Sequence, residues 1–368
     1  MKIKTLFRLL TIAALVLFVI PSCVKEGPPG LAGADGSNGT NGSDGADGEV
    51  ACLVCHGGDN LNEIRGEFAV SEHSAGAIAV DYAGGRASCA PCHSHEQFVQ
   101  TMTLGKVNGD IANPSAWQCS TCHGIHATFE QEDFALRTTA PVDILGTSYD
   151  IGNNSNLCAT CHKPRRGWDD YDDLSHPDSV MVTSTHAGPH HGPQASLMMG
   201  VGGDHRIGSI DASVIGPSPH GSNTEKGTCV GCHMYDGEAG DEGGHTFWPS
   251  LESCQECHET DDFDYNGKQK IINDLLAELA ELLENEVGQP IKEVEIDGEE
   301  QWVVESGTVT GIIHEEDGAY HPVVGQFSRD AYSAFWNFIT IYEDRSHGVH
   351  NPPYAEALLH NSIEVLKD

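Results

Sequence analysis

The C-terminal third of the chain carries the clearest pattern of apolar and polar positions. Its apolar positions are Ile271, Leu275, Leu276, Leu279, Leu282 and Leu283, with glutamates between them. Intervals of three and four place these residues on one face of a helix of about twenty residues. The helix is predicted to end before Gly288 and Pro290. We expect its apolar face to pack on the preceding part of the chain, and a partner helix or a dimer contact is the alternative.

One hairpin and two further helices are predicted after this helix. Residues 291–296 and 301–305 flank Asp297-Gly298, a dipeptide that favours a tight hairpin turn. A second helix is predicted over residues 328–343, which are rich in Tyr, Phe and Trp. Asn351-Pro352-Pro353 opens a third helix, because Asn caps helices and Pro is tolerated in the first turn.

The N-terminal apolar segment, residues 9–20, is shorter than the ~20 residues that span a bilayer. Three cations precede it, as in a secretory signal peptide. The following Ile20-Pro21-Ser22-Cys23 is similar to a bacterial lipoprotein signal, in which a small residue precedes the Cys that is lipidated. We therefore expect residues 1–22 to be a lipoprotein signal peptide and Cys23 to be the lipidation site. An ordinary signal peptide with an incidental Cys is the alternative, and we expect no other segment to cross a membrane.

Glycine recurs at every third position from Gly27 to Gly48, giving eight Gly-X-Y triplets. A collagen triple helix requires this period because only Gly fits at its axis. Proline occurs in the first triplet alone, so a flexible acidic stalk is favoured over a trimeric rod. In either form, residues 23–50 would hold the following domain away from a membrane surface.

Composition adds a chemical constraint. The 368 residues include 55 Asp and Glu but 19 Lys and Arg, which argues against a nucleic-acid partner because phosphate binding needs clustered cations. Only 7% of residues are aromatic, which is few for a core of this size. Thirteen Cys beside 21 His require disulfides, metal ions or haem, and the odd count sets one Cys apart.

Twelve of the cysteines belong to six copies of one motif, Cys-x-x-Cys-His. The cysteine pairs are Cys52 and Cys55, Cys89 and Cys92, Cys119 and Cys122, Cys158 and Cys161, Cys229 and Cys232, and Cys254 and Cys257; the histidines are His56, His93, His123, His162, His233 and His258. A chain of this composition would contain about 0.03 copies by chance. Two thiols at this spacing can each bind one vinyl group of the same haem, and the next His becomes the proximal ligand of its iron.

Other uses of paired cysteines fit this repeat poorly. Zinc ribbons and disulfide frameworks need no His after each pair, and a thioredoxin-like redox pair occurs once. The sequence therefore predicts six covalently bound haem c groups within residues 51–265. At this density the porphyrins themselves supply the core. We expect a mainly α fold with much irregular structure and short helices following several motifs, joined to a C-terminal helical module with a small β-hairpin, residues 266–368.

The sixth ligand of each iron is expected to be a second histidine. Fifteen His remain beyond the motifs, whereas only five Met follow the signal peptide. Bis-histidine ligation gives lower potentials than methionine ligation. The longest gap between motifs contains His176, His186, His190, His191, His205 and His220. We expect this gap to donate several distal ligands.

The chain resembles exported multihaem c-type cytochromes, the broad group that contains pentahaem nitrite reductases and octahaem relatives. The segments that carry the resemblance are 71–74, 188–194, 218–220, 244–247 and 346–352, within residues 51–368. The distal ligands that it implies are His73, His126, His190, His220, His245 and His350. It favours His190 over His191 and His350 over His347. The best-known nitrite reductases have Lys in place of the motif His at the catalytic haem, but all six motifs here end in His.

These features predict an electron carrier rather than an enzyme, lipid-anchored at the outer membrane or cell surface. Its expected partners are other redox proteins or cytochromes, or an extracellular electron acceptor. One alternative is an oxidoreductase that acts on a nitrogen or sulfur compound such as nitrite, hydroxylamine or tetrathionate at one open haem. Its candidate proton donors are Arg165, Arg166, His186 and His191. Another alternative is a subunit of an extracellular cytochrome filament, and the stalk also allows a trimer.

Overall fold

The computed structural model describes residues 59–76, 78–125, 135–171, 178–223, 225–237, 243–296 and 298–368. The chain divides into Met1–Glu49 and Val50–Asp368, and every described residue belongs to the second unit. The expected signal peptide, Cys23, the stalk, the first motif (Cys52, Cys55 and His56) and His126 lie outside the described residues. Within the described ranges, no helix is both long and apolar enough to cross a membrane.

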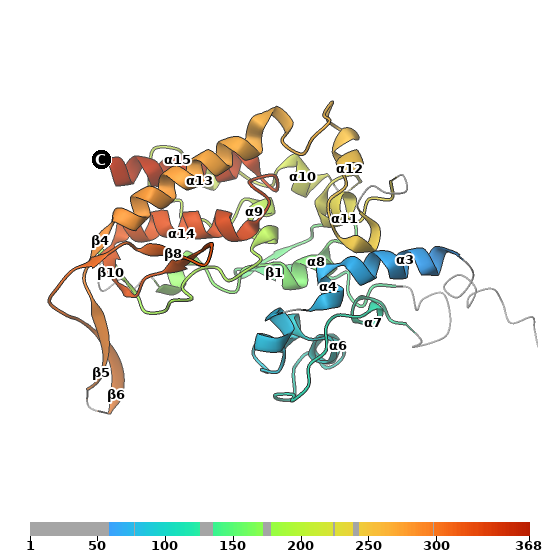
Figure 1. Cartoon of the computed structure of the whole chain (residues 1–368), viewed down its shortest axis with the longest axis horizontal. Helices are drawn as coiled ribbons and strands as arrows, with labels where there is room; N and C mark the ends of the chain where they lie inside the picture. The colour runs from blue at the N-terminus through green and yellow to red at the C-terminus, as the bar shows by residue number, and fades with distance from the viewer. Residues whose placement is uncertain are drawn as a thin grey trace, which may run out of the picture. The chain divides into compact units, whose positions relative to one another are not determined.

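Three long helices dominate the C-terminal part of the chain, as predicted. They are α13 (Lys268–Asn285), α14 (Arg329–Asp344) and α15 (Pro352–Lys367), and they pack against one another (Figure 1). The Asn351 side chain accepts a hydrogen bond from the Tyr354 backbone N–H at 3.4 Å, which confirms the predicted cap of α15.

The core of these helices is centred on α14. Trp336 and Phe335 of α14 and Tyr354 of α15 are fully buried, and Ile272 and Leu279 of α13 cover them. The apolar face of α13 therefore packs mainly on α14 and α15. This differs from the expected packing on the preceding part of the chain, because α14 is buried along nearly its whole length and needs cover on several sides.

The strands of the described residues form antiparallel pairs. These are β1 (Val142–Ile144) with β2 (Thr147–Tyr149), β3 (Ser179–Val182) with β10 (Gly325–Ser328), β4 (Val287–Gly288) with β7 (Val309–Thr310), β5 (Ile291–Ile296) with β6 (Glu299–Val304), and β8 (Ile313–Glu316) with β9 (Ala319–Pro322). The predicted hairpin is β5–β6, which extends as an arm in Figure 1. The β3–β10 pair joins the segment between the fourth and fifth motifs to the C-terminal helices.

One short helix follows a motif as expected, α6 (His95–Leu104) after the second, and further short helices carry the described motifs themselves. They are α5 (Ala90–His93), α7 (Cys119–Cys122), α8 (Asn156–Cys161), α11 (Thr228–His233) and α12 (Leu251–Gln255). One helical turn brings residues i and i+3 to the same side, so both thiols of a motif face one cofactor. The remaining helices are α3 (Asp59–Val70), α4 (Glu72–Ala75), α9 (Gln194–Met199), α10 (Pro219–Ser222), η1 (Ala79–Gly84), η3 (Trp168–Tyr171), η4 (Ala212–Val214), η5 (Gly244–Thr246) and η6 (Tyr265–Gly267). Short helices joined by irregular chain agree with the predicted fold class.

Candidate haem-binding cavity

A cavity of about 2420 Å³ lies among the helices that carry the motifs. All ten described motif cysteines and all five described motif histidines line it. A site for one small molecule has a volume of roughly 300–1,000 Å³. The cavity is therefore large enough for several bulky cofactors that share one interior.

Each described motif histidine faces a histidine from a distant part of the chain. Numbered by motif order, the pairs and their ring-centroid distances are His93 and His190 at the second site (5.9 Å), His123 and His245 at the third (6.3 Å), His162 and His73 at the fourth (6.0 Å), His233 and His350 at the fifth (6.4 Å), and His258 and His220 at the sixth (6.1 Å). The five partners are the distal histidines that the family resemblance implies among the described residues.

These distances fit an iron atom held between two imidazole rings. A metal–imidazole bond is about 2.0 Å long, and the ring centroid lies about 1.1 Å behind the bonded nitrogen for C–N bonds of ~1.33 Å. Two such ligands on opposite sides of an iron separate their centroids by about 6.2 Å. By contrast, the 5.8 Å between His314 and His321 follows from their opposite positions in the β8–β9 hairpin. The donor set therefore fits covalent haem with two axial histidines.

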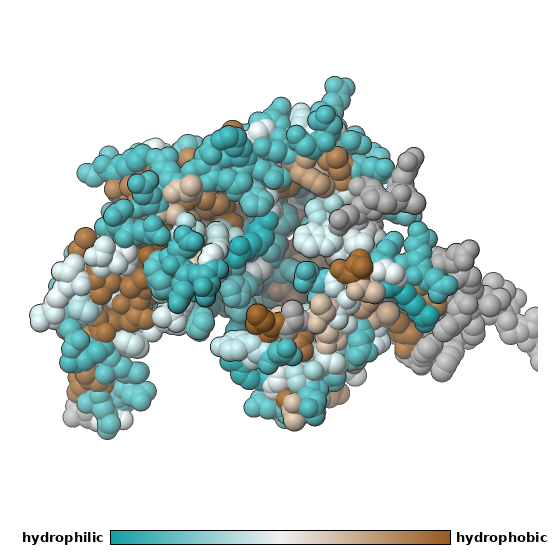
Figure 2. Space-filling view, viewed as in Figure 1, coloured by the Kyte–Doolittle hydropathy of each residue, from teal (hydrophilic) through white to brown (hydrophobic). Residues whose placement is uncertain are grey.

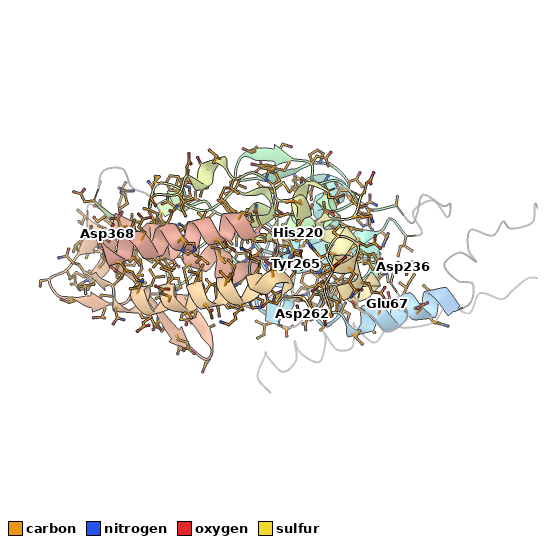
Figure 3. All side chains as sticks on the ribbon, turned by 90° about the horizontal axis from the view of Figure 1, so that it is seen from above. Glu67, His220, Asp236, Asp262, Tyr265 and Asp368 are labelled. Carbon is orange, nitrogen blue, oxygen red and sulfur yellow. The ribbon has the colours of Figure 1, made fainter. Side chains whose placement is uncertain are left out.

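Short turns position the distal histidines. His73 lies on α4, whose first turn is capped by Ser71: the Ser71 hydroxyl oxygen accepts a hydrogen bond from the Ser74 N–H at 3.2 Å. His220 lies on α10, close to Tyr265 in Figure 3, and both of these rings contact the His258 ring. Such turns present one side chain to the cavity without a long helix.

The second ring nitrogen of several ligands has a defined partner. The contacts of Nδ1 are with the Phe247 carbonyl oxygen for His233 (2.8 Å), the Val349 carbonyl oxygen for His220 (2.6 Å), the Gln194 Oε1 for His162 (3.2 Å) and the Asp344 Oδ1 for His350 (2.6 Å). Such a partner fixes the ring orientation and tautomer, and leaves Nε2 to bind the metal. The four rings are therefore prearranged as ligands.

The electrostatic surroundings keep two distal histidines neutral. Burial and the charge of His162 lower the pKa of His73 to about 4. Burial, His191 and Arg165 lower the pKa of His190 to about 4. Neutral imidazole is the form that binds iron, so both rings are ready to coordinate at neutral pH.

His350 has a different environment. Its partner Asp344 is fully buried, and the Asp344 carboxylate also accepts hydrogen bonds from Ser346. Burial alone would lower the pKa of His350, but the nearby negative charge of Asp344 outweighs burial and raises it. The fifth site thus contains a buried carboxylate that is hydrogen-bonded to the ring facing the motif histidine His233.

The other histidines of the two ambiguous segments have partners of their own. His191 Nδ1 contacts Glu343 Oε2 at 2.8 Å, and His347 Nδ1 contacts Asn273 Oδ1 at 2.7 Å. Neither is paired with a motif histidine among the described residues, whereas His190 and His350 are.

Two of the candidate proton donors lie beside the second site. Arg165 and His191 both act electrostatically on His190. Arg166 instead donates a hydrogen bond to the Tyr171 hydroxyl, and the exposed His186 donates its backbone N–H to Ser184. The structure therefore does not gather the four donors at one iron site.

Two functional residues were missed by reasoning from the sequence. The first is Asp344, which lies at the end of a predicted helix and carries no motif. The second is Phe247, whose ring packs edge-on against His73 at 4.7 Å and His245 at 5.9 Å. The sequence of the Gly-His-Thr-Phe segment points to its histidine alone. Nothing in it indicates that the ring of Phe247 contacts His73 and His245 while its carbonyl oxygen contacts Nδ1 of His233.

The described cysteines and the paired histidines fit covalently bound haem with two histidine ligands at each site. Comparison with known proteins adds little to this. No protein-family model and no curated protein match the chain. One solved structure that it resembles is the crystal structure of the outer cell wall cytochrome OcwA, with a TM-score of 0.47 and 19% sequence identity. The match covers 82% of this chain but 50% of that one, so the chain spans about half the length of that cytochrome.

Proposed function

We propose that this protein transfers electrons through six covalently bound haem c groups, each ligated by two histidines. The observation that carries the proposal is that all five described motif histidines face a second histidine at 5.9 to 6.4 Å. Haem iron would supply a one-electron couple at each site. Because the first motif has the same Cys-x-x-Cys-His pattern, it would hold the remaining haem. His126 is the distal ligand that the family resemblance implies for it.

The residues of the chain set the properties of each site. Two thioether bonds and two imidazoles fix the cofactor, so it exchanges an electron without large reorganisation. A His on both sides of the iron leaves no open coordination position for a substrate at the five described sites. This favours electron transfer over reduction of a nitrogen or sulfur compound, which would have to occur at the first site.

The cellular setting is part of the proposal. We infer an exported protein that is lipid-anchored through Cys23 and held off the membrane by the Gly-X-Y stalk. The net charge of −36 and the largely hydrophilic face in Figure 2 favour a basic patch on the redox partner. Partners of this kind include another cytochrome, an extracellular acceptor, or a second copy of the chain in a filament.

The test of the electron-transfer proposal is spectroscopic. We expect six haems per chain, reversible reduction in a potentiometric titration, and low-spin ferric signals alone in the electron paramagnetic resonance spectrum of the oxidised protein. A stoichiometric high-spin signal, or turnover of nitrite or hydroxylamine, would contradict it.

Membrane attachment needs a separate experiment. Cys23→Ser should release the protein from the membrane fraction while all six haems stay attached. A variant that remains membrane-bound would refute the lipid anchor without touching the electron-transfer proposal.

A further inference from the structure

The fourth motif lies beside two other motifs. The Cys92 Sγ of the second motif lies 3.9 Å from the carbonyl oxygen of Thr160, between the two cysteines of the fourth motif, and the Cys158 sulfur of the fourth motif lies beside the Cys229 sulfur of the fifth. Each of these sulfurs is the attachment point of its own haem. A haem attached at the fourth motif would therefore lie beside those attached at the second and fifth motifs.

Buried hydrogen bonds hold the fourth and fifth motifs in this contact. Ser155, which caps α8, donates its hydroxyl hydrogen to the Thr228 hydroxyl oxygen at 2.8 Å and accepts from the Val230 N–H at 3.1 Å. Ser155 and Thr228 are both buried. The starts of α8 and α11 are thus tied together beside the Cys158–Cys229 contact.

The third site also lies beside the fourth. The Cys122 thiol is within electrostatic range of both Cys158 and Cys161. On the distal side, the Phe247 ring lies between His73 of the fourth site and His245 of the third. The two sites are therefore neighbours through their cysteines and through their distal ligands.

The fifth site connects the fourth to the sixth. The carbonyl oxygen of Cys232 in the fifth motif accepts a hydrogen bond at 3.1 Å from the N–H of Ser250, the N-cap residue of the helix that contains Cys254 of the sixth. On the distal side, the Nδ1 of His220 of the sixth site contacts the carbonyl oxygen of Val349, the residue before His350 of the fifth, at 2.6 Å. The described contacts thus give the fourth site three neighbouring sites, whereas the sixth has one.

We propose that the haem at the fourth site is a branch point, through which electrons pass between the second, third and fifth sites, with the sixth reached through the fifth. This rests on the proposed electron-transfer function. In each step one iron is oxidised from ferrous to ferric and its neighbour is reduced from ferric to ferrous. No bond breaks and no proton moves, and an external redox protein supplies and removes the electron.

The test changes one distal ligand at the branch point and one at an end. Methionine raises the potential of a haem, so in His73→Met the fourth haem should stay reduced while the others titrate. The added negative charge disfavours reduction of each adjacent haem by Coulomb repulsion, which falls with distance. Electron paramagnetic resonance during the titration resolves the individual haems. We expect a several-fold decrease in the ratio of reduced to oxidised haem, at fixed potential, at three other sites.

His220→Met is the matched control, because it makes the same substitution at the sixth site. Of the described sites, only the fifth should show a lower ratio of reduced to oxidised haem in this variant. The branch point would be overturned if this ratio changed at equal numbers of haems in the two variants. It would also be overturned if the ratio changed at a single haem in His73→Met.

A measurement on the unmodified protein covers the case in which His73→Met does not fold. Nuclear magnetic resonance of partly reduced protein should show that the fourth haem interacts with three described sites and the sixth with one. Interaction of the fourth haem with a single described site would refute the branch. Absence of reversible low-spin haem would instead refute the proposed function itself, so the two failures are distinguishable.

Discussion

The Nδ1 atom of His350 lies 2.6 Å from Oδ1 of Asp344, whose side chain is fully buried. Three other rings have Nδ1 contacts with uncharged oxygens, such as the Phe247 carbonyl at His233. The Nδ1 of His245 lies 3.8 Å from Oε2 of Glu67, a carboxylate that is partly exposed rather than buried. A buried negative charge on an axial imidazole makes the ring a stronger donor and stabilises ferric iron. The fifth site should therefore have the lowest potential of the sites that share this pattern of ligation.

Asp344→Asn should raise the midpoint potential of the fifth haem. The amide oxygen can still accept the hydrogen bond from His350, so the change removes the charge and keeps the geometry. We expect an increase of about 60 mV, which corresponds to a tenfold change for a one-electron couple. Potentiometric titration followed by visible and electron paramagnetic resonance spectra measures it.

Glu343→Gln is the control for this prediction. Glu343 is the adjacent residue and is mostly buried, but it bonds to His191, which is not paired with any of the five described motif histidines. It should leave the fifth haem unchanged. If both variants raise that potential equally, a general loss of negative charge explains the shift and the specific role of Asp344 is wrong.

The ring planes of the histidine pairs predict two classes of haem. The planes are steeply inclined at the second, fourth and sixth sites, at 69°, 79° and 86°, but closer to parallel at the third and fifth, at 38° and 40°. Perpendicular axial rings leave two iron d orbitals nearly equal in energy, which gives a strongly anisotropic low-spin signal in electron paramagnetic resonance. Near-parallel rings separate these two orbitals in energy and give a rhombic low-spin signal. We expect three described haems of the first kind and two of the second in the spectrum of the oxidised protein. Five identical rhombic signals would contradict the structure.

The motif repeat and the C-terminal helices were predictable because each rests on local signals. The spacing within Cys-x-x-Cys-His specifies both the cofactor and its proximal ligand. Capping residues and apolar periodicity likewise define α13, α14 and α15 from neighbouring positions. The hairpin β5–β6 followed from its Asp-Gly turn for the same reason.

The sequence does not predict which distal histidine pairs with which motif histidine, because this pairing depends on contacts between distant segments. Nothing in the sequence near His73 indicates that it meets His162 rather than His93. The β3–β10 pair is another such case, since it joins strands on either side of two motifs. The roles of Asp344 and Phe247 exist only once the chain has folded around the cavity.

Asp204 anchors the C-terminal helices through a buried charge. Its carboxylate accepts hydrogen bonds from Arg206 at 2.6 and 2.9 Å and from Ser333 at 2.6 Å, and its side chain is fully buried. Burial alone would raise its pKa, but the bonds from Arg206 and Ser333 outweigh burial and hold the pKa below its usual value. Because the folded-state pKa is lower than the unfolded one, this stabilisation is present above about pH 4 and is lost as the pH falls through the folded pKa.

Asp204→Asn should destabilise the fold at neutral pH by about 3 kcal/mol, because it removes the charge of a fully buried carboxylate that accepts hydrogen bonds from Arg206 and Ser333. The difference from the unmodified protein should shrink in acid. Thermal unfolding at pH 7 and pH 3, followed by circular dichroism, measures both effects. Asp274→Asn, which breaks the exposed Lys270–Asp274 pair, is the control and should have little effect at either pH. A loss of stability that is the same at pH 3 and pH 7 would show that the carboxylate charge is not the cause.

Replacement of both cysteines of one motif should remove one haem and part of the core. In the double variant Cys119→Ala, Cys122→Ala, the mass should decrease by the mass of one haem in addition to the change from the two substitutions. The cavity would lose one of the groups that fill it, and voids in a protein interior are costly. We therefore expect a lower unfolding temperature than that of Cys23→Ser, which removes a cysteine outside the motifs and should keep six haems. Intact mass and thermal unfolding of the two variants test this, and an unchanged mass in the double variant would refute covalent attachment at the third motif.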